Sequence, residues 1–295
     1  MSWRDGTAAA GHPFALCLTH DVDRPFKRAP QALFHALRGR PAYHLRTGLP
    51  DRNPYWQFDE IMRLEDSFGV RSAFYFLQEP PLTAYDPPAW LQPGNWVEHL
   101  GRYDITAPAV REAIERLHDG GWEVGLHASR LAARDPARLA AEKRRLESVL
   151  GDRVIGCRHH HLELVADTWE HHRHVGLEYD ASLGSASLAG FQHGSHPYRP
   201  GSDFLVFPLS AMEVALPDPA GRGREARESV DQLLRRAARE GAVMTVLWHP
   251  RYFAESEFPG YRDLYRYLLR RARELGAWVG SPRDLLGHPE GPSTG

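Results

Sequence analysis

The sequence lacks the features of several protein classes. Its 295 residues contain two cysteines, Cys17 and Cys157, and both lie in apolar segments where a buried free thiol is common, so nothing indicates a disulfide framework. No apolar run reaches the roughly 18 residues of a membrane-spanning helix. The first residues also lack the apolar core of a signal peptide. We therefore expect a cytoplasmic protein with no membrane span.

The sequence also lacks a large excess of positive or of negative charge. The chain has 36 basic and 38 acidic residues, a formal net charge of −2. This balance gives no general attraction to nucleic acid, so we expect no nucleic-acid partner. Arginine-rich stretches at 222–239 and 262–273 carry interleaved acids, which favours solvated helix faces. Glycine-rich dinucleotide and phosphate loops are absent too, and the sequence does not indicate an oligomeric state.

Apolar strand-like and amphipathic helical segments alternate along almost the whole chain. Strands are predicted at 14–20, 70–77, 122–127, 154–158, 176–180, 204–207, 243–248 and 277–280; helices at 30–38, 58–68, 108–119, 136–150, 224–240 and 261–275. Residues 24–57 otherwise read as an irregular excursion. Such alternation is typical of a parallel sheet with helical crossovers, and the absence of a dinucleotide turn favours a barrel. We predict an α/β fold, a distorted (β/α)7-type barrel, as one domain over 13–287 with an N-terminal arm at 1–12 and a C-terminal tail at 288–295.

Titratable side chains follow the ends of five predicted strands. They are Asp21 with Asp23, His127, the run His159, His160 and His161, Asp180, and His249. The carboxyl ends of barrel strands meet at one face, so these side chains are expected to form a shared polar site.

Side-chain alternation sorts the residues of the first strand. Cys17, Thr19, Asp21 and Asp23 share one face, while His20 faces the other way and is expected to be a core histidine. Two neighbouring carboxylates repel each other, and a divalent metal on one of them would offset this and leave the other as a base. The alternative is a pair of solvated loop aspartates. By similar reasoning we expect Trp248 in the core and the run His171, His172 and His174 in solvent.

The order of these motifs resembles the polysaccharide deacetylase superfamily, or NodB homology domain, over roughly residues 14–285. The matching segments are Thr19-His-Asp21-Val-Asp23, Glu123-Val-Gly-Leu-His127, Arg158-His159-His160-His161, Tyr179-Asp180-Ala-Ser182 and Leu247-Trp248-His249. The first looks like the branch in which the two aspartates are two residues apart. One position departs from the family, because Leu131 stands where a second metal-binding histidine is usual.

The resemblance implies a role for each matching residue. Asp21 would be the general base, Asp23 and His127 metal ligands, and His249 the acid that protonates the leaving amine. Asp180 would orient a catalytic partner, for which Arg158 is the natural mate. The third ligand is then open: we favour His160, with His159, His161 or no tight metal as alternatives. The cofactor expected is a divalent metal, with Zn²⁺ favoured, and no organic cofactor is indicated.

We therefore predict a metal-dependent hydrolase that removes an N-acetyl or similar acyl group from a carbohydrate or glycoconjugate. The alternatives are a metal-independent hydrolase of another non-peptide C–N bond and a catalytically inactive sugar-binding domain. Loops at 80–101 and 190–199 could shape the sugar pocket, with candidate stacking rings at Trp90, Trp96, Phe191 and Tyr198.

Overall fold

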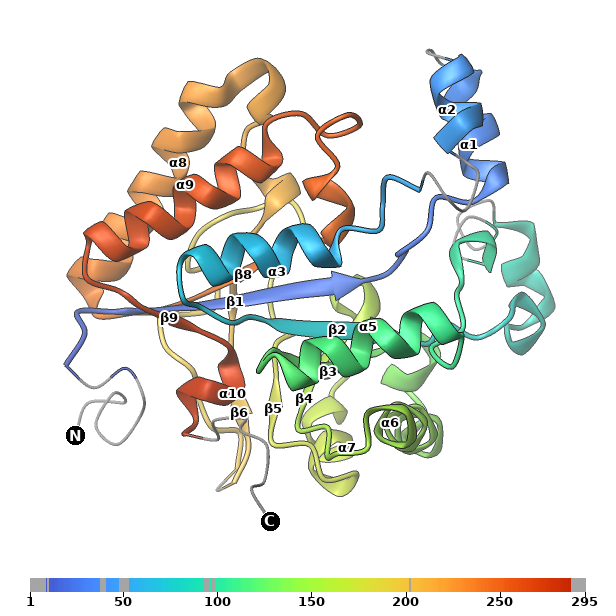
Figure 1. Cartoon of the computed structure of the whole chain (residues 1–295). Helices are drawn as coiled ribbons and strands as arrows, with labels where there is room; N and C mark the ends of the chain where they lie inside the picture. The colour runs from blue at the N-terminus through green and yellow to red at the C-terminus, as the bar shows by residue number, and fades with distance from the viewer. Residues whose placement is uncertain are drawn as a thin grey trace.

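A curled sheet of parallel strands organises the part of the chain that the computed structural model describes, which is residues 9, 11–37, 41–47, 53–92, 96, 99–201 and 203–287 (Figure 1). The strands are β1 Ala15–Val22, β2 Ala73–Leu77, β3 Glu123–Ala128, β4 Gly156–His159, β5 Tyr179–Asp180, β6 Leu205–Val206, β7 Leu209–Met212, β8 Val243–Leu247 and β9 Trp278–Gly280. Their order is β6-β5-β4-β3-β2-β1-β8-β7, and β9 pairs with the start of β1.

The two ends of this order are neighbours in the chain. Only residues 207 and 208 separate β6 from β7, although β6 pairs with β5 and β7 pairs with β8 at the other end. Two residues span only a few ångströms, so the sheet must curl until its edges nearly meet. The predicted distorted barrel is thereby confirmed. β7 was not predicted, and no helix lies between β6 and β7.

Most of the helices cover the outside of the curled sheet (Figure 1). They are α1 Ala29–Ala36, α2 Pro41–Thr47, α3 Phe58–Ser67, α5 Pro108–Asp119, α6 Pro136–Leu150, α7 Thr168–His174, α8 Pro219–Glu240, α9 Tyr261–Glu274 and α10 Pro282–Leu285. The excursion at 24–57 is more regular than expected, because it holds α1 and α2, which pack on each other and stand away from the barrel.

Local sequence explains the bounds of these helices. In α6 the side chain of Asp135 accepts a hydrogen bond from the backbone N–H of Arg138, and Pro136 occupies the first turn. Gly151 ends the helix in the left-handed conformation at φ 78°, which glycine adopts without strain. α8 begins earlier than predicted because Asp218 caps it, and a kink at Arg222 breaks its first turn.

Alternation along β1 separates two layers of core, as predicted. Leu16 and Leu18 belong to the main apolar cluster between sheet and helices, while Cys17 belongs to a second cluster inside the barrel. His20 also faces the helices, where Nε2 lies 3.0 Å from Glu65 Oε1, which confirms it as a core histidine. Trp248 is buried in the outer layer, also as predicted.

Tyrosines fill the middle of the barrel because two glycines leave room for them. A Cβ atom on Gly125 would lie 2.4 Å from the Tyr75 ring, and one on Gly156 would lie 2.1 Å from the Tyr179 hydroxyl. The two hydroxyls lie 2.8 Å apart, and Tyr179 donates to Glu123 at 2.6 Å. This packed layer fills the barrel below the carboxyl ends of the strands. The polar residues at those ends are therefore supported by close-packed side chains.

The ends of the chain lie largely outside the described residues. The predicted tail at 288–295 and most of the arm at 1–12 fall there; of the arm, Ala9 is buried and the ring of His12 contacts the Gly276 carbonyl at 3.0 Å. Within the described ranges, every helix is too short or too polar to cross a bilayer.

Candidate active site

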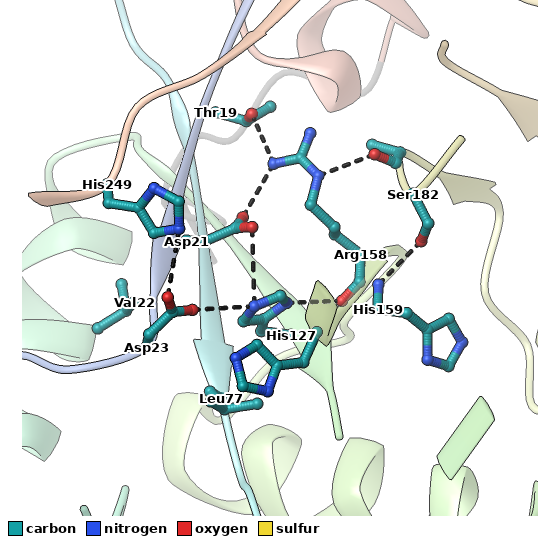
Figure 2. A network of polar contacts seen from close by, with 12 residues as sticks. Thr19, Asp21, Val22, Asp23, Leu77, His127, Arg158, His159, Ser182 and His249 are labelled. Atoms are coloured by element: carbon teal, nitrogen blue, oxygen red, sulfur yellow. Dashed lines mark hydrogen bonds and ion pairs between the residues drawn. The ribbon is translucent and has the colours of Figure 1, made fainter. Parts of the chain in front are cut away.

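Asp21 lies at the end of β1 and is tied to the barrel interior by Arg158. The Arg158 Nη1 group donates to Asp21 Oδ1 at 2.9 Å and to the hydroxyl of Thr19 at 2.8 Å (Figure 2). Arg158 is fully buried, and its guanidinium lies over the Tyr75 ring. Burial opposes the charge of Arg158, but the charge and hydrogen bond of Asp21, together with Tyr75 and Tyr179, outweigh burial, so the pKa of Arg158 is raised. Asp21 therefore has a fixed orientation and a permanent counter-charge.

Asp23, two residues after Asp21, contacts more of the charged side chains at the site than Asp21 does. Its Oδ1 lies 3.1 Å from His127 Nε2, and its Oδ2 lies 3.2 Å from His249 Nε2 (Figure 2). The same Oδ2 lies 3.2 Å from Arg251 Nη1. Burial would raise the pKa of Asp23. The positive charge of His249 and the hydrogen bonds from both histidines outweigh burial and hold the pKa well below its usual range. Asp23 is thus ionised and available as a ligand.

Two histidines beside Asp23 have outer partners that fix their tautomers. His127 Nδ1 donates to the Arg158 carbonyl at 2.8 Å, and His160 Nδ1 lies 3.1 Å from a carboxylate oxygen of Glu79. In the neutral form of each ring Nε2 is the nitrogen that carries the lone pair; without a metal, His127 Nε2 instead donates to Asp23 Oδ1, and the carboxylates of Asp21 and Asp23 raise the pKa of His127 against the effect of burial. One ligand atom from each of Asp23, His127 and His160 lies within 4.8 Å of the others. Outer carboxylate or carbonyl partners of this kind are typical of metal-binding histidines.

The other residues of the histidine run lie elsewhere. His159 points away from Asp23 (Figure 2), and its ring stacks on that of His172. Burial lowers the pKa of both rings to about 3. His172 is fully buried, so its predicted place in solvent was wrong. His161 is exposed, and Leu131 begins a short 3₁₀ turn. Among the candidates for the third position, His160 is the one that groups with Asp23 and His127.

The backbone after His160 is unusual. His161 and Leu162 both have positive φ, 60° and 56°, in a short 3₁₀ segment that ends the strand β4. Left-handed conformations of such residues cost free energy and concentrate at functional sites. The turn places His160 toward the cleft and brings the His161 ring against it, with ring centroids 4.1 Å apart and the ring planes tilted by 34°.

His249 has a carboxylate partner that the sequence analysis missed. Its Nδ1 lies 2.7 Å from Glu213 Oε1, and Glu213 is fully buried. Burial would lower the pKa of His249, but the charges of Glu213 and Asp23 raise it to about 9. His249 is therefore protonated at neutral pH. Glu213 directly follows β7, so the rule of titratable residues at strand ends would have found it had that strand been predicted.

Two further charged residues at the site were also missed. Glu79, two residues after β2, accepts from His160 and from the Tyr85 hydroxyl; burial would raise its pKa, but these hydrogen bonds and the charge of His160 lower it. Arg251 follows His249 by two residues and pairs with Asp23. Both lie just beyond strand ends, where side-chain alternation no longer predicts direction.

Asp180 does not meet Arg158 as expected. On β5 the neighbouring Tyr179 points into the barrel, so Asp180 points outward. There it accepts hydrogen bonds from the backbone and hydroxyl of Ser182, at 3.0 and 2.6 Å, and from the Trp169 indole at 3.4 Å. The expected Arg158–Asp180 pair was wrong, and the mate of Arg158 is Asp21.

A cleft of about 240 Å³ opens over these groups. Its lining residues are Asp21, Asp23, Arg24, His127, His160, His161, Leu162, Ala186, Met212, Glu213, Val214, His249 and Arg251. The four aromatic rings suggested for sugar stacking are not among them. Phe191 is buried in the core, Tyr198 packs on Trp169, and the exposed Trp90 and Trp96 donate to backbone carbonyls of the 80–101 loop.

Comparison with known proteins rests on structure. No family profile matches the chain, and no curated protein matches it by sequence. A protein of Mycobacterium smegmatis assigned as a polysaccharide deacetylase superposes with a TM-score of 0.62 at 19% identity, over 95% of this chain and 91% of the other. The Puue allantoinase superposes with a TM-score of 0.60 at 14% identity, over 94% of this chain and 90% of the other. The chitin deacetylase of the fungus Colletotrichum lindemuthianum superposes with a TM-score of 0.53 at 14% identity, over 97% of this chain and 92% of the other. The chain thus has the fold of the polysaccharide deacetylases.

Proposed function

We propose that this chain is a divalent-metal-dependent hydrolase that removes an acyl group from an amide nitrogen of a carbohydrate. The observation that carries the proposal is the grouping of Asp23, His127 and His160, with an ionised carboxylate and two tautomerically fixed rings. One carboxylate and two imidazoles are a donor set that suits zinc and leaves a position for water or substrate. The residues present therefore fit the metal that the fold family implies.

Asp21 and His249, which flank Asp23, are suited to opposite proton transfers: one accepts a proton and the other donates one. When bound, a divalent metal at Asp23, His127 and His160 would supply Lewis acidity and lower the pKa of water. Asp21, held by Arg158, is placed to accept a proton from the attacking water. His249, protonated and oriented by Glu213, is placed to donate a proton to the amide nitrogen as the C–N bond breaks, because an amide anion is a poor leaving group.

The size of the cleft bears on the substrate. A volume of about 240 Å³ lies below the ~300–1,000 Å³ usual for small-molecule pockets. One sugar unit with its acyl group is the favoured occupant of the cleft itself. The chitin deacetylase and the M. smegmatis protein, whose fold this chain shares, support a sugar amide as the first class to test.

A second candidate is hydrolysis of another non-peptide C–N bond without a metal. The specific observation behind it is that His127, His249 and Arg251 already surround Asp23 with positive or donating groups. Leu131 at the position of a usual ligand agrees with it, and so does the fold likeness to an allantoinase. Under this reading Asp23 would be a structural counter-charge and the cleft would work with Asp21 and His249 alone.

One experiment separates the two. The purified protein is stripped with a chelator and assayed, with and without added Zn²⁺, for acid release from a panel of N-acetylated sugars. Turnover that appears only with metal and is lost in His160→Ala supports the deacetylase. Turnover on a cyclic or linear ureide that survives chelation would contradict it. His174→Gln, an exposed change on α7, is the control that both readings expect to be active.

A further inference from the structure

A second cluster of metal-ligating side chains lies on the opposite face of β4. Arg158 and His160 serve the cleft, whereas Cys157 and His159 alternate with them and point toward α7. There they meet His172, from the second half of α7. At most 1% of the surface of each of these three residues is exposed.

The geometry of this cluster is tight. One ligand atom from each of Cys157, His159 and His172 lies within 4.8 Å of the others. The Nε2 atoms of the two rings are 2.8 Å apart, and the rings stack with centroids 5.0 Å apart. The carboxylate of Asp180 lies beside the cluster, with Oδ2 3.7 Å from His172 Nδ1, beyond hydrogen-bond distance.

A hydrogen bond between the two rings does not satisfy their nitrogens. Among the described residues, the Nδ1 atom of His172 has no hydrogen-bond partner and no contact with solvent, whereas the ring of His159 also interacts with the backbone of Ser129. An unmet buried polar group costs about 1–3 kcal/mol, so buried polar atoms are usually paired. Packing alone does not explain why two imidazole rings, one with an unmet nitrogen, are buried next to a thiol.

We propose that Cys157, His159 and His172 bind a second, thiophilic metal ion, with Zn²⁺ the first expectation. One thiolate and two imidazoles form a ligand set that proteins use for zinc and for copper, and zinc needs no redox chemistry here. Binding breaks the S–H bond of Cys157, forms a sulfur–metal bond and releases one proton to solvent. This ion is separate from the one at Asp23, where no sulfur is present.

The location indicates what the ion does. Its ligands join α7 to β4, and β4 carries Arg158 and leads into His160. The ion would hold this wall of the cleft in register, with Asp180 and Ser182 packed beside it. Its role is therefore structural, and the protein should unfold at a lower temperature without it.

Cobalt substitution tests the proposal, because a thiolate bound to Co²⁺ gives an intense near-ultraviolet charge-transfer band that oxygen and nitrogen ligands do not give. The full chain is stripped, reloaded with Co²⁺ and scanned. We expect the band in the unchanged protein and in His127→Ala, and its loss in Cys157→Ser. Cys17→Ser is the matched control: Cys17 is also a fully buried thiol on a barrel strand, but it is not part of the cluster.

Metal stoichiometry gives the second readout. Elemental analysis of the zinc-loaded protein should give two equivalents per chain, falling to one in Cys157→Ser, in His172→Gln and in His127→Ala. If Cys157→Ser fails to fold, His172→Gln with its spectrum and melting curve decides the question. A cobalt protein without the thiolate band, or zinc content unchanged by His172→Gln, overturns the proposal. Neither readout depends on hydrolytic activity. The second metal site is therefore tested separately from the function proposed for the cleft.

Discussion

Glu213 Oε1 lies 2.7 Å from His249 Nδ1, and this contact sets the charge of the cleft. Both side chains are buried, and His249 also faces Asp23 across 3.2 Å. The paired carboxylate makes the imidazolium the stable form, whereas the ion pair with Arg158 fixes the orientation of Asp21 in the same cleft. The hydrolysis proposed above needs an acid and a base in one cleft, and His249 and Asp21 are the residues proposed for these roles.

Stability of the metal-free protein should depend on His249. Its pKa in the folded state is about 9, against an ordinary 6.5, so protonation stabilises the fold fully below pH 6.5. This contribution, at most ~3 kcal/mol, is lost as pH rises from 6.5 to 9. In Glu213→Gln the loss should be smaller, because the raising charge is gone. Urea unfolding with chelator across this pH range measures it; parallel pH profiles for both proteins would contradict the assignment.

Removing the charge of Arg158 should destabilise the fold. Arg158→Met removes the 2.9 Å ion pair of Asp21, which is 3% exposed, and leaves His127 Nε2 at 3.7 Å as its remaining charged neighbour; breaking a buried pair costs about 3–5 kcal/mol. The double variant Arg158→Met with Asp21→Asn should regain part of that loss, since no buried charge is left alone. Denaturant unfolding of the two single variants and the double variant gives the coupling. Additive effects would mean that the pair does not interact as drawn.

Glu79 should control metal affinity from outside the ligand set. Glu79→Gln weakens the hydrogen bond to His160 Nδ1. Loss of such an outer partner typically lowers metal affinity by about 10–100-fold. Titration of the stripped protein with Zn²⁺ and a competing chelator measures the change. Glu170→Gln removes an exposed carboxylate on α7 and is the control. Equal affinities for the two variants would remove Glu79 from the site.

The glycine of the Gly156-Cys-Arg-His strand is a packing requirement. Gly156→Ala would place Cβ 2.1 Å from the Tyr179 hydroxyl, which is fixed by Tyr75 and Glu123. Overpacking of this kind costs about 1–3 kcal/mol. Gly223→Ala, where a Cβ meets nothing within 4 Å in α8, should leave stability unchanged or raise it by up to ~1 kcal/mol. Thermal melts of the two variants compare them, and similar melting temperatures would refute the packing argument.

The sequence predicted those parts of the site that follow from strand periodicity. Alternation along β1 placed Asp21 and Asp23 inside the barrel, and strand ends supplied His127 and His249. The same rule, applied to β5, would have corrected one error: Tyr179 points inward, so Asp180 has to point outward and cannot reach Arg158.

Other features depend on tertiary contacts that no local pattern carries. β7 is four residues, Leu-Ser-Ala-Met, and becomes a strand by pairing with β8, so Glu213 had no predicted strand before it. α7 is seven residues long and rich in histidine, a pattern typical of a polar helix, yet one of its faces packs against β5 and α6 and buries His172. Glu79 follows β2 in a proline-rich segment where direction cannot be predicted.

Asp21, in β1, and Asp23, just after it, should differ in function although only one residue lies between them. Asp23→Asn removes the ionised ligand beside His127 and should weaken Zn²⁺ binding by more than the ~10–100-fold expected for an outer partner. Asp21→Asn should keep the metal and lower turnover by about 10²–10⁴-fold, because a general base is lost while Arg158 still finds an oxygen acceptor. Zinc titration and acid release on the same preparations test both variants. If Asp21→Asn loses the metal while Asp23→Asn keeps it, the two roles are reversed, and the base would then be the carboxylate that faces His249.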